Sequence, residues 1–219
     1  MPDWVGPVAE YVLEVGLKET LKLAAVSVVA SAVIGVALGT FLTIRWLPIR
    51  APIRLYIEVW RGLPIVVTIL FIFFALPTFD LRFSAYTAAA IGLSLWGSAQ
   101  VAEATRGAVQ SIPREQHEAA AALGFGWVGR HVYVVLPQAL RRLLPPMVGL
   151  LVNVIQNTTV AFVIGVPETL EASTRQMNNL TQATGDPHAF EILGAVMVMF
   201  FLISFPLTRL ARYLERRLV

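Results

Sequence analysis

Residues Glu118 to Pro137 read EAAAALGFGWVGRHVYVVLP. Four alanines follow the glutamate, and alanine favours a helix more strongly than any other residue. Gly124 and Gly126 come next, and glycine is the residue that most commonly ends a helix. The stretch lies between long apolar segments. It therefore predicts a short, slim helix in a loop between two membrane helices, followed by a second segment that ends in Leu-Pro.

The residues before this stretch favour a helix start. Ser111 is a residue type that caps helices, and Pro113 is tolerated in a first turn. Glu115 and Glu118 would lie early in the helix, where its dipole favours carboxylates. The alanines would leave a narrow surface that the groove of another protein could approach closely. A solvated connecting helix without a partner is the alternative interpretation.

The composition identifies an integral membrane protein. Hydrophobic residues make up 57% of the 219 residues, charged residues 14%, and the mean hydropathy is +0.69. Soluble domains carry about a quarter charged residues. Without cysteine the chain forms no disulfide or thiolate metal site. The spacing of His117, His131 and His188 predicts no metal site. Without a glycine-rich phosphate loop we expect the chain not to bind ATP itself. We also expect no cofactor and no nucleic-acid partner.

Five segments are apolar enough to span a membrane, although the second is short for the roughly 20 residues that a spanning helix needs. We find no internal repeat, and the loops are too short for a soluble domain. We therefore predict an all-α integral membrane bundle in a single transmembrane domain, residues 1–219. The predicted spans are residues 23–44, 61–77, 85–108, 145–166 and 190–210, and the predicted cytoplasmic loop is residues 111–142.

The N-terminal residues lack the basic start of a cleavable signal peptide, so we expect them to be retained. Two interpretations of residues 8–22 remain open. They can form an amphipathic helix on the membrane surface, or they can extend the first span beyond the membrane.

The basic residues are distributed unevenly between the two sides of such a bundle. Five spans place thirteen arginines on one side and four basic residues, Lys18, Lys22, Arg82 and Arg175, on the other. Basic residues near span ends favour the cytoplasmic side. We therefore predict an external N-terminus and a cytoplasmic C-terminus, which places Glu118 and its loop in the cytoplasm.

The loop resembles the EAA loop of the membrane subunits of ABC importers. The residues that carry the resemblance are Glu118, Ala119, Ala120, Gly124, Leu136 and Pro137. The likeness extends over about residues 58–170 and is strongest to the polar amino-acid uptake subfamily, the histidine, glutamine and arginine type of permease. Its other motifs here are Arg61-Gly62-Leu63-Pro64, Ala102-Glu103 with Arg106-Gly107, Leu136 to Arg142, and Val163 to Glu168.

The resemblance implies a transporter subunit that is not itself an enzyme, in a bacterial or archaeal cytoplasmic (inner) membrane. It implies a dimer with itself or with a paralogous permease subunit, contacts with membrane lipid, an extracytoplasmic solute-binding protein, and a small polar amino acid as substrate. Two cytoplasmic ABC ATPase subunits would dock on the loop through Glu118, Ala119, Ala120 and Gly124.

The sequence departs from the subfamily pattern at four positions. Leu63 replaces the usual Thr, Gln100 stands where Tyr is common, Glu115 replaces a Gly, and Gln156 stands where Lys often occurs. These changes leave the fold and the coupling role in place but leave the transported solute open. Homodimer and heterodimer are both compatible with the sequence.

Polar residues inside the spans are candidates for a translocation path, because such residues usually face a bundle interior or a water-filled cavity. Gln100, Glu103 and Gly107 share a helical face by their spacing, and Thr68 would lie on the same face as Arg61. The path candidates are Thr68, Gln100, Glu103, Asn153, Gln156, Asn157 and Thr158.

Structural roles are the alternative for these polar residues. Hydrogen bonds between helices would explain them equally, and Glu103 with Arg106 could be an ion pair at i, i+3 spacing. At the level of the whole chain, the rival interpretations are an ion-coupled secondary transporter and a non-transporting membrane scaffold for an ABC ATPase. The first would usually show repeats or broken helices, and neither is clear in the sequence.

Overall fold

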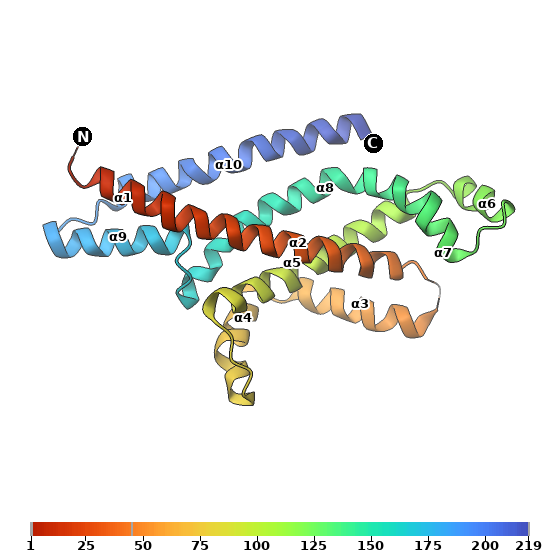
Figure 1. Cartoon of the computed structure of the whole chain (residues 1–219), viewed down its shortest axis with the longest axis horizontal. Helices are drawn as coiled ribbons and strands as arrows, with labels where there is room; N and C mark the ends of the chain where they lie inside the picture. Colours follow the sequence, from red (N-terminus) through yellow and green to blue (C-terminus); the bar gives the residue numbers. More distant parts are fainter. Residues whose placement is uncertain (1, 45, 219) are drawn as a thin grey trace. The chain divides into compact units, whose positions relative to one another are not determined.

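The computed structural model describes residues 2–44 and 46–218, and every regular element in these residues is helical. The first half contains α1 (Val5–Tyr11), η1 (Val12–Leu17), α2 (Lys18–Phe41), α3 (Leu47–Gly62), α4 (Ile65–Leu70), η2 (Phe71–Ala75), η3 (Leu76–Phe79) and α5 (Ala85–Gln110). The second half contains α6 (Arg114–Ala122), α7 (Trp127–Arg130), η4 (His131–Val135), α8 (Leu136–Asn157), η5 (Thr158–Ile164), α9 (Thr169–Thr184) and α10 (Ala189–Leu218) (Figure 1).

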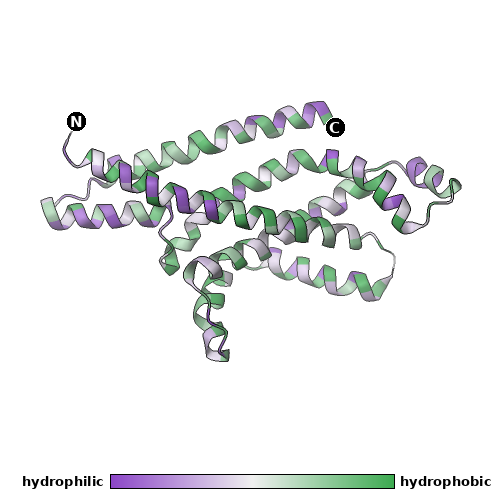
Figure 2. Ribbon diagram, viewed as in Figure 1, coloured by the Kyte–Doolittle hydropathy of each residue, from purple (hydrophilic) through white to green (hydrophobic). Residues whose placement is uncertain are grey.

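Three helices in the described residues are long and apolar enough to cross a membrane: Val5–Phe41, Trp127–Ile164 and Ala189–Leu218. A bent pair, Leu47–Gly62 with Ile65–Phe79, would add a fourth. Hydrophobic residues line most of α10, and hydrophilic residues gather toward its C-terminal end (Figure 2). The all-helical membrane fold is confirmed, whereas the five spans and the orientation of the termini stay predictions.

The structure yields up to four candidate spans, whereas the sequence predicts five, and the additional predicted span is α5. Its 26 residues are long enough for a bilayer at 1.5 Å per residue. Small and polar residues such as Gly92, Ser98 and Gln100 make it less apolar than the other spans. Much of its surface is covered by protein, because Ala88, Ala89, Leu93, Ser98, Ala99 and Ala102 are all fully buried.

The N-terminal segment forms one continuous helix with the first span, Val5–Phe41. Of the two interpretations of residues 8–22, this continuity favours the extension of the span over a separate surface helix. Val8 and Val12 pack on Ile192 of α10. Gly16 lies against α9, since a Cβ at this position would come within 2.9 Å of the Thr169 Cα.

Helices α3 and α4 meet at an angle of 104°. Leu63 precedes a proline, which disfavours helical backbone, and Pro64 begins α4 in an extended conformation with ψ 129°. Helix α3 is not among the segments predicted from the sequence. Its helical signal is a series of apolar residues at i, i+4, i+7, i+8 and i+11: Ile49, Ile53, Tyr56, Ile57 and Trp60.

The predicted fourth span, residues 145–166, belongs to a longer helical segment that begins at Trp127. Pro145 and Pro146 lie inside α8 and do not mark its start. The predicted first, third and fifth spans correspond to α2, α5 and α10, with ends that differ by a few residues at most sites and by eight at the C-terminal end of α10.

The chain divides into two compact units. The first comprises residues 1–29, 63–94 and 151–206, and Ile69 packs in it against Gly92 of α5. The second comprises residues 30–62, 95–150 and 207–219. In the second unit Gly35 and Gly39 bring α2 close to α5, since a Cβ on Gly35 would lie 2.4 Å from the Val101 Cβ. Such small residues spaced by four allow membrane helices to pack closely.

Candidate coupling helix and polar path

The alanine-rich stretch forms α6, as predicted, but its start differs from the expectation. Pro113 is the residue at the N-terminal boundary, with ψ 144°, and no side chain caps the helix. The Ser111 hydroxyl donates instead to the carbonyl of Ala108, 2.8 Å away. Ser111 as the cap is therefore wrong, because three residues, Ser111 to Pro113, separate the end of α5 from the start of α6.

The two faces of α6 differ in exposure. Ala120 is buried, with 3% of its surface exposed, whereas Glu118 and Ala119 are exposed. Arg114 Nε donates to Glu118 Oε1 at 2.7 Å, an i, i+4 pair along the exposed surface. The helix thus has one side on the protein and a free side that carries the predicted docking residues.

Gly124 ends the helix in the left-handed conformation, with φ +83°. Its N–H donates to the carbonyl of Ala121 at 2.9 Å, and the N–H of Phe125 donates to the carbonyl of Ala120 at 3.1 Å. This pair of bonds is the Schellman motif, in which glycine avoids the steric cost of a Cβ. Gly124 as the residue that ends the helix is therefore confirmed, whereas Gly126 is the residue that precedes α7.

Side-chain hydrogen bonds connect the region around α6 to helix α8. Gln138 Nε2 of α8 donates to Gln116 Oε1 of α6 at 3.2 Å, and Arg142 donates to the hydroxyl of Ser111 at 3.0 Å. A buried apolar cluster also joins the end of α5 to η4 and α8. Its members are Ala108, Val109, Ile112, Val135, Ala139 and Leu143. These contacts connect the region around α6 to α5 and α8.

Two of the predicted path residues lie on α5 in the second unit. Arg61 Nε donates to Gln100 Oε1 at 3.2 Å. Glu103 accepts from Arg106 through both carboxylate oxygens, and the bond to Arg106 Nε is 3.0 Å long. Arg106 also donates to Gln110. The Glu103–Arg106 ion pair is as expected, and Gln100 gains a cationic partner that the sequence did not indicate.

Thr68 lies in the first unit and is buried. The expectation that it shares a helical face with Arg61 is wrong, because the chain bends by 104° between α3 and α4. Spacing along a sequence predicts a common face only within one uninterrupted helix. The Thr68 hydroxyl faces the carbonyl of Pro64 in its own helix at 3.4 Å.

The remaining path candidates, Asn153, Gln156 and Asn157 of α8 and Thr158 of η5, also belong to the first unit. The Thr158 hydroxyl donates to the carbonyl of Ile155 at 2.7 Å, and Asn157 Nδ2 donates to the carbonyl of Asn153 at 2.8 Å. These bonds stay within the same helical segment. Gln156 Nε2 reaches Ser204 of α10 at 3.4 Å, and both Gln156 and Asn153 are exposed in the isolated chain. The path candidates of the two units are thus polar residues on helices. Their role in transport stays a prediction.

Glu168 is a buried polar group that the sequence analysis did not single out. Its side chain is fully buried and accepts from the N–H groups of Leu170 and Glu171, at 3.0 and 2.9 Å, at the start of α9. Burial raises the pKa of this carboxyl to about 7, against the lowering effect of these two bonds. The Pro-Glu-Thr order before a polar helix was the available signal for a cap.

The described residues contain no group of three or more His, Asp or Glu placed to hold a metal. His117 and His131, which lie far apart in the sequence, come together with ring centroids 6.3 Å apart. They stand beside a cavity near α6 and have no third ligand there.

Known proteins with similar sequences share one description. The family "Binding-protein-dependent transport system inner membrane component" matches residues 31–219. The glutamine transport system permease protein GlnP of Escherichia coli (strain K12) is 38% identical over 221 residues, which cover 99% of this chain and 97% of that protein. The probable glutamine ABC transporter permease protein GlnP of Bacillus subtilis (strain 168) is 32% identical, with coverages of 92% and 91%.

Solved structures agree with the sequence relatives. A crystal structure of an amino acid ABC transporter with histidines superposes with a TM-score of 0.84 at 28% identity and covers 99% of both chains. The MetNI methionine ABC transporter has a TM-score of 0.73 at 20% identity, which concerns the fold alone. Such relatives are transporter components and not enzymes, and they are multi-pass proteins of the cytoplasmic membrane. This chain belongs to the family of binding-protein-dependent transport system inner membrane components, the permease subunits of ABC transporters.

Proposed function

We propose that this chain is the membrane subunit of an ATP-driven importer for a polar amino acid, coupled to its ATPase through α6. The observation that carries the proposal is the form of α6 itself. Ala120 holds the helix on the protein, Glu118 and Ala119 are free for a partner, and Gly124 ends the helix sharply. A short helix with one free face suits insertion into a groove of another protein.

Coupling would follow from the attachments of α6. ATP binding closes the ATPase dimer, and α6 moves with the ATPase subunit that holds it. The bonds from Gln138 and Arg142, together with the buried cluster around Ile112, carry this movement into α5 and α8. Helices that line the path would then change their tilt, and the path would open to the other side of the membrane.

The proposed topology has five spans, with α5 and the bent α3–α4 pair counted among them. The N-terminus is external and the C-terminus cytoplasmic, so α6 meets ATPase subunits on the side where ATP is present. The asymmetry of thirteen to four basic residues supports this orientation. Five helices do not readily enclose a path, so we propose a dimer with an identical or paralogous subunit and an external solute-binding protein.

The substrate proposed is a neutral polar or cationic amino acid. Gln156 stands where related permeases often carry Lys, so a positive charge is missing from the proposed path, whereas Glu103 is retained. Permeases named for glutamine are among the relatives with high coverage, which favours a neutral side chain. The path would consist of Thr68, Gln100, Glu103, Asn153, Gln156, Asn157 and Thr158.

An ion-coupled transporter is the second candidate, and the bend of 104° between α3 and α4 is the observation that favours it. Broken helices are common in such transporters. A non-transporting scaffold for an ATPase is the third candidate. Dependence of uptake on ATP separates the proposal from the ion-coupled transporter, and uptake of any solute separates it from the scaffold.

The test is reconstitution of the chain with its co-encoded ATPase and solute-binding protein in liposomes. ATPase activity and uptake are measured for glutamine, arginine, lysine, histidine and glutamate. We expect uptake that requires ATP and stimulation by one or a few of these amino acids. Uptake driven by an ion gradient without ATP would contradict the proposal, and so would ATPase activity that no solute stimulates.

A further inference from the structure

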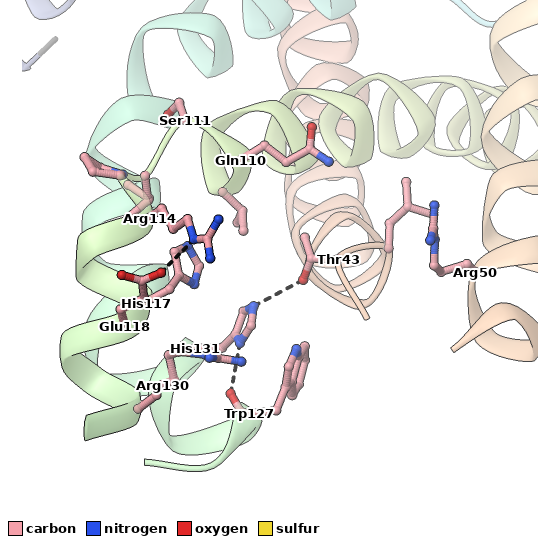
Figure 3. Close-up of a pocket in the computed structure, with 15 residues that line it drawn as sticks. Thr43, Arg50, Gln110, Ser111, Arg114, His117, Glu118, Trp127, Arg130 and His131 are labelled. Atoms are coloured by element: carbon pink, nitrogen blue, oxygen red, sulfur yellow. Dashed lines mark hydrogen bonds and ion pairs between the residues drawn. The ribbon is translucent and has the colours of Figure 1, made fainter. Parts of the chain in front are cut away.

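A cavity of about 1090 Å³ lies beside α6 in the second unit. Its walls come from the end of α2, the start of α3, the end of α5, and helices α6 and α7. Figure 3 shows Arg114, His117 and Glu118 on one wall, Arg130 and His131 below them, and Thr43 and Arg50 on the opposite side. None of the path candidates lines this cavity, so it is a separate feature of the molecule.

The charge of the lining is strongly positive. Arg50, Arg114 and Arg130 face a single carboxylate, Glu118, whose charge is already paired with Arg114 at 2.7 Å. Within residues 2–44 and 46–218, Arg50 and Arg130 make no ion pair. The Nε of Arg130 is buried and has no hydrogen-bond partner among the described residues. A buried donor without an acceptor is costly, and an anion held in the cavity would satisfy it.

The positive charge of Arg130 also acts on His117 and His131. Burial lowers the pKa of His117, and the charge of Arg130 lowers it further. His131 lies between two acceptors, because its Nδ1 is 2.9 Å from the Trp127 carbonyl and its Nε2 is 3.2 Å from the Thr43 hydroxyl. That hydroxyl already donates to the carbonyl of Thr40. Burial also lowers the pKa of His131, against the raising effect of its bond to the Trp127 carbonyl, and the charge of Arg130 adds to the lowering.

We propose that this cavity binds a phosphate group. The planar guanidinium groups of Arg50 and Arg130 match phosphate oxygens in pairs, and the ring of His117 can supply a further hydrogen bond. The volume leaves room for the group to which the phosphate is esterified. The phosphate can come from the headgroup of an anionic lipid in the cytoplasmic leaflet or from free phosphate in the cytoplasm.

The test measures binding and does not depend on transport, so its failure is separate from failure of the proposed function. The full chain is purified in detergent, alone and with its co-encoded ATPase. In one arm, native mass spectrometry compares retention of phosphatidylglycerol and phosphatidylcholine. In the other, calorimetry measures binding of inorganic phosphate against chloride at constant ionic strength. We expect preferential binding of phosphatidylglycerol, of inorganic phosphate, or of both, and each result identifies the source.

Three substitutions of the same kind locate the site. Arg130→Gln and Arg50→Gln should each weaken the binding about tenfold, because each removes a charge-assisted bond. Arg212→Gln removes an exposed arginine of α10 outside the cavity and should leave the binding unchanged. Glu118→Gln removes the one carboxylate among the described lining residues and should strengthen the binding. This variant provides a second test of the site if Arg130→Gln does not fold.

The proposal is overturned if the wild-type chain binds neither probe in preference to its control. It is also overturned if Arg130→Gln and Arg50→Gln bind as the wild type does, or if Arg212→Gln weakens binding equally. Loss of ATPase association in Arg130→Gln, without any phosphate binding in the wild type, would identify an acidic side chain of the ATPase as the occupant instead.

Discussion

The hydroxyl oxygens of Thr20 and Thr169 lie 2.9 Å apart, and both side chains are fully buried. The N–H of Thr169 also donates to the Thr20 hydroxyl, at 3.1 Å. Thr20 belongs to α2 and Thr169 is the first residue of α9, so one buried hydroxyl joins the first span to a helix that follows about 150 residues later. Gly16, one turn earlier, permits this close approach because it has no Cβ.

Replacing Thr20 with valine should destabilise the protein by about 1–3 kcal/mol, because valine has a similar shape but leaves the N–H and hydroxyl of Thr169 without a partner. The midpoint of thermal unfolding in detergent measures the effect. Thr20→Ser keeps the hydroxyl and should cost less. Equal unfolding midpoints for Thr20→Val and the wild type would show that water replaces the lost bond.

The buried carboxyl of Glu168 should make stability depend on pH. Its pKa in the folded chain is about 7, compared with about 4.5 for an ordinary glutamate. Between these pH values the folded chain keeps a proton that the unfolded chain has lost, so the free energy of unfolding falls as the pH rises. The expected loss is roughly 3 kcal/mol between pH 4.5 and pH 7.5.

Glu168→Gln tests this assignment, because glutamine cannot titrate and should remove most of the pH dependence. Unfolding midpoints are measured between pH 5 and pH 8. Glu191→Gln, at an exposed position of α10, is the control and should keep the wild-type slope. Parallel pH profiles for the two variants would mean that another group is responsible.

Gly124 and Gly126 offer a matched test of the coupling helix. Gly124 has φ +83°, where a Cβ costs about 1–2 kcal/mol, whereas Gly126 has φ −67° and open space around it. Gly124→Ala should weaken ATPase association and coupled transport several-fold, and Gly124→Asp should abolish transport while the membrane helices stay folded. Gly126→Ala should behave as the wild type. Normal transport in purified Gly124→Asp would disprove the coupling role.

The orientation of the termini can be read by cysteine labelling, because the chain has no cysteine of its own. The structure determines the choice of site. Ser173, in the predicted external loop, is fully buried and would not react, whereas Gln182 of α9 is exposed. Gln182→Cys should react with an impermeant reagent added to intact cells, and Arg216→Cys should react only after the membrane is opened. The reverse pattern would reject the topology.

Local patterns predicted the parts of the molecule that depend on nearby residues. The alanine run and the glycines after it predicted α6 and the conformation of Gly124, because helix propensity and the need for a positive φ are local properties. The Glu103–Arg106 pair follows from i, i+3 spacing on one helix in the same way.

Burial and bends were harder to predict, since they depend on distant residues. The position of Thr68 relative to Arg61 was extrapolated through Pro64, where the helix breaks. Glu168 and Ser173 are polar residues of a predicted loop, and the packing of distant segments such as α2 and η1 against α9 contributes to their burial. Hydropathy alone does not distinguish a buried polar residue from an exposed one.

The substrate preference can be tested at Gln156, one of the proposed path residues, which is exposed on α8 in the isolated chain. Gln156→Lys would add a cation to the proposed path. At an effective dielectric constant of about 20, two cations about 8 Å apart repel each other by roughly 2 kcal/mol, which corresponds to more than a tenfold change. Uptake of lysine and arginine should therefore fall about tenfold relative to glutamine.

Glu103→Gln should shift the preference in the same direction, because it removes the carboxylate that would attract a cationic solute. Gln182→Lys makes the same chemical change as Gln156→Lys on exposed α9 and should leave the ratio of uptake rates unchanged. The measurement is competitive uptake of lysine, glutamine and glutamate by the reconstituted transporter. An equal fall for all three amino acids would mean that Gln156 and Glu103 only hold helices together, and that the solute-binding protein alone selects the substrate.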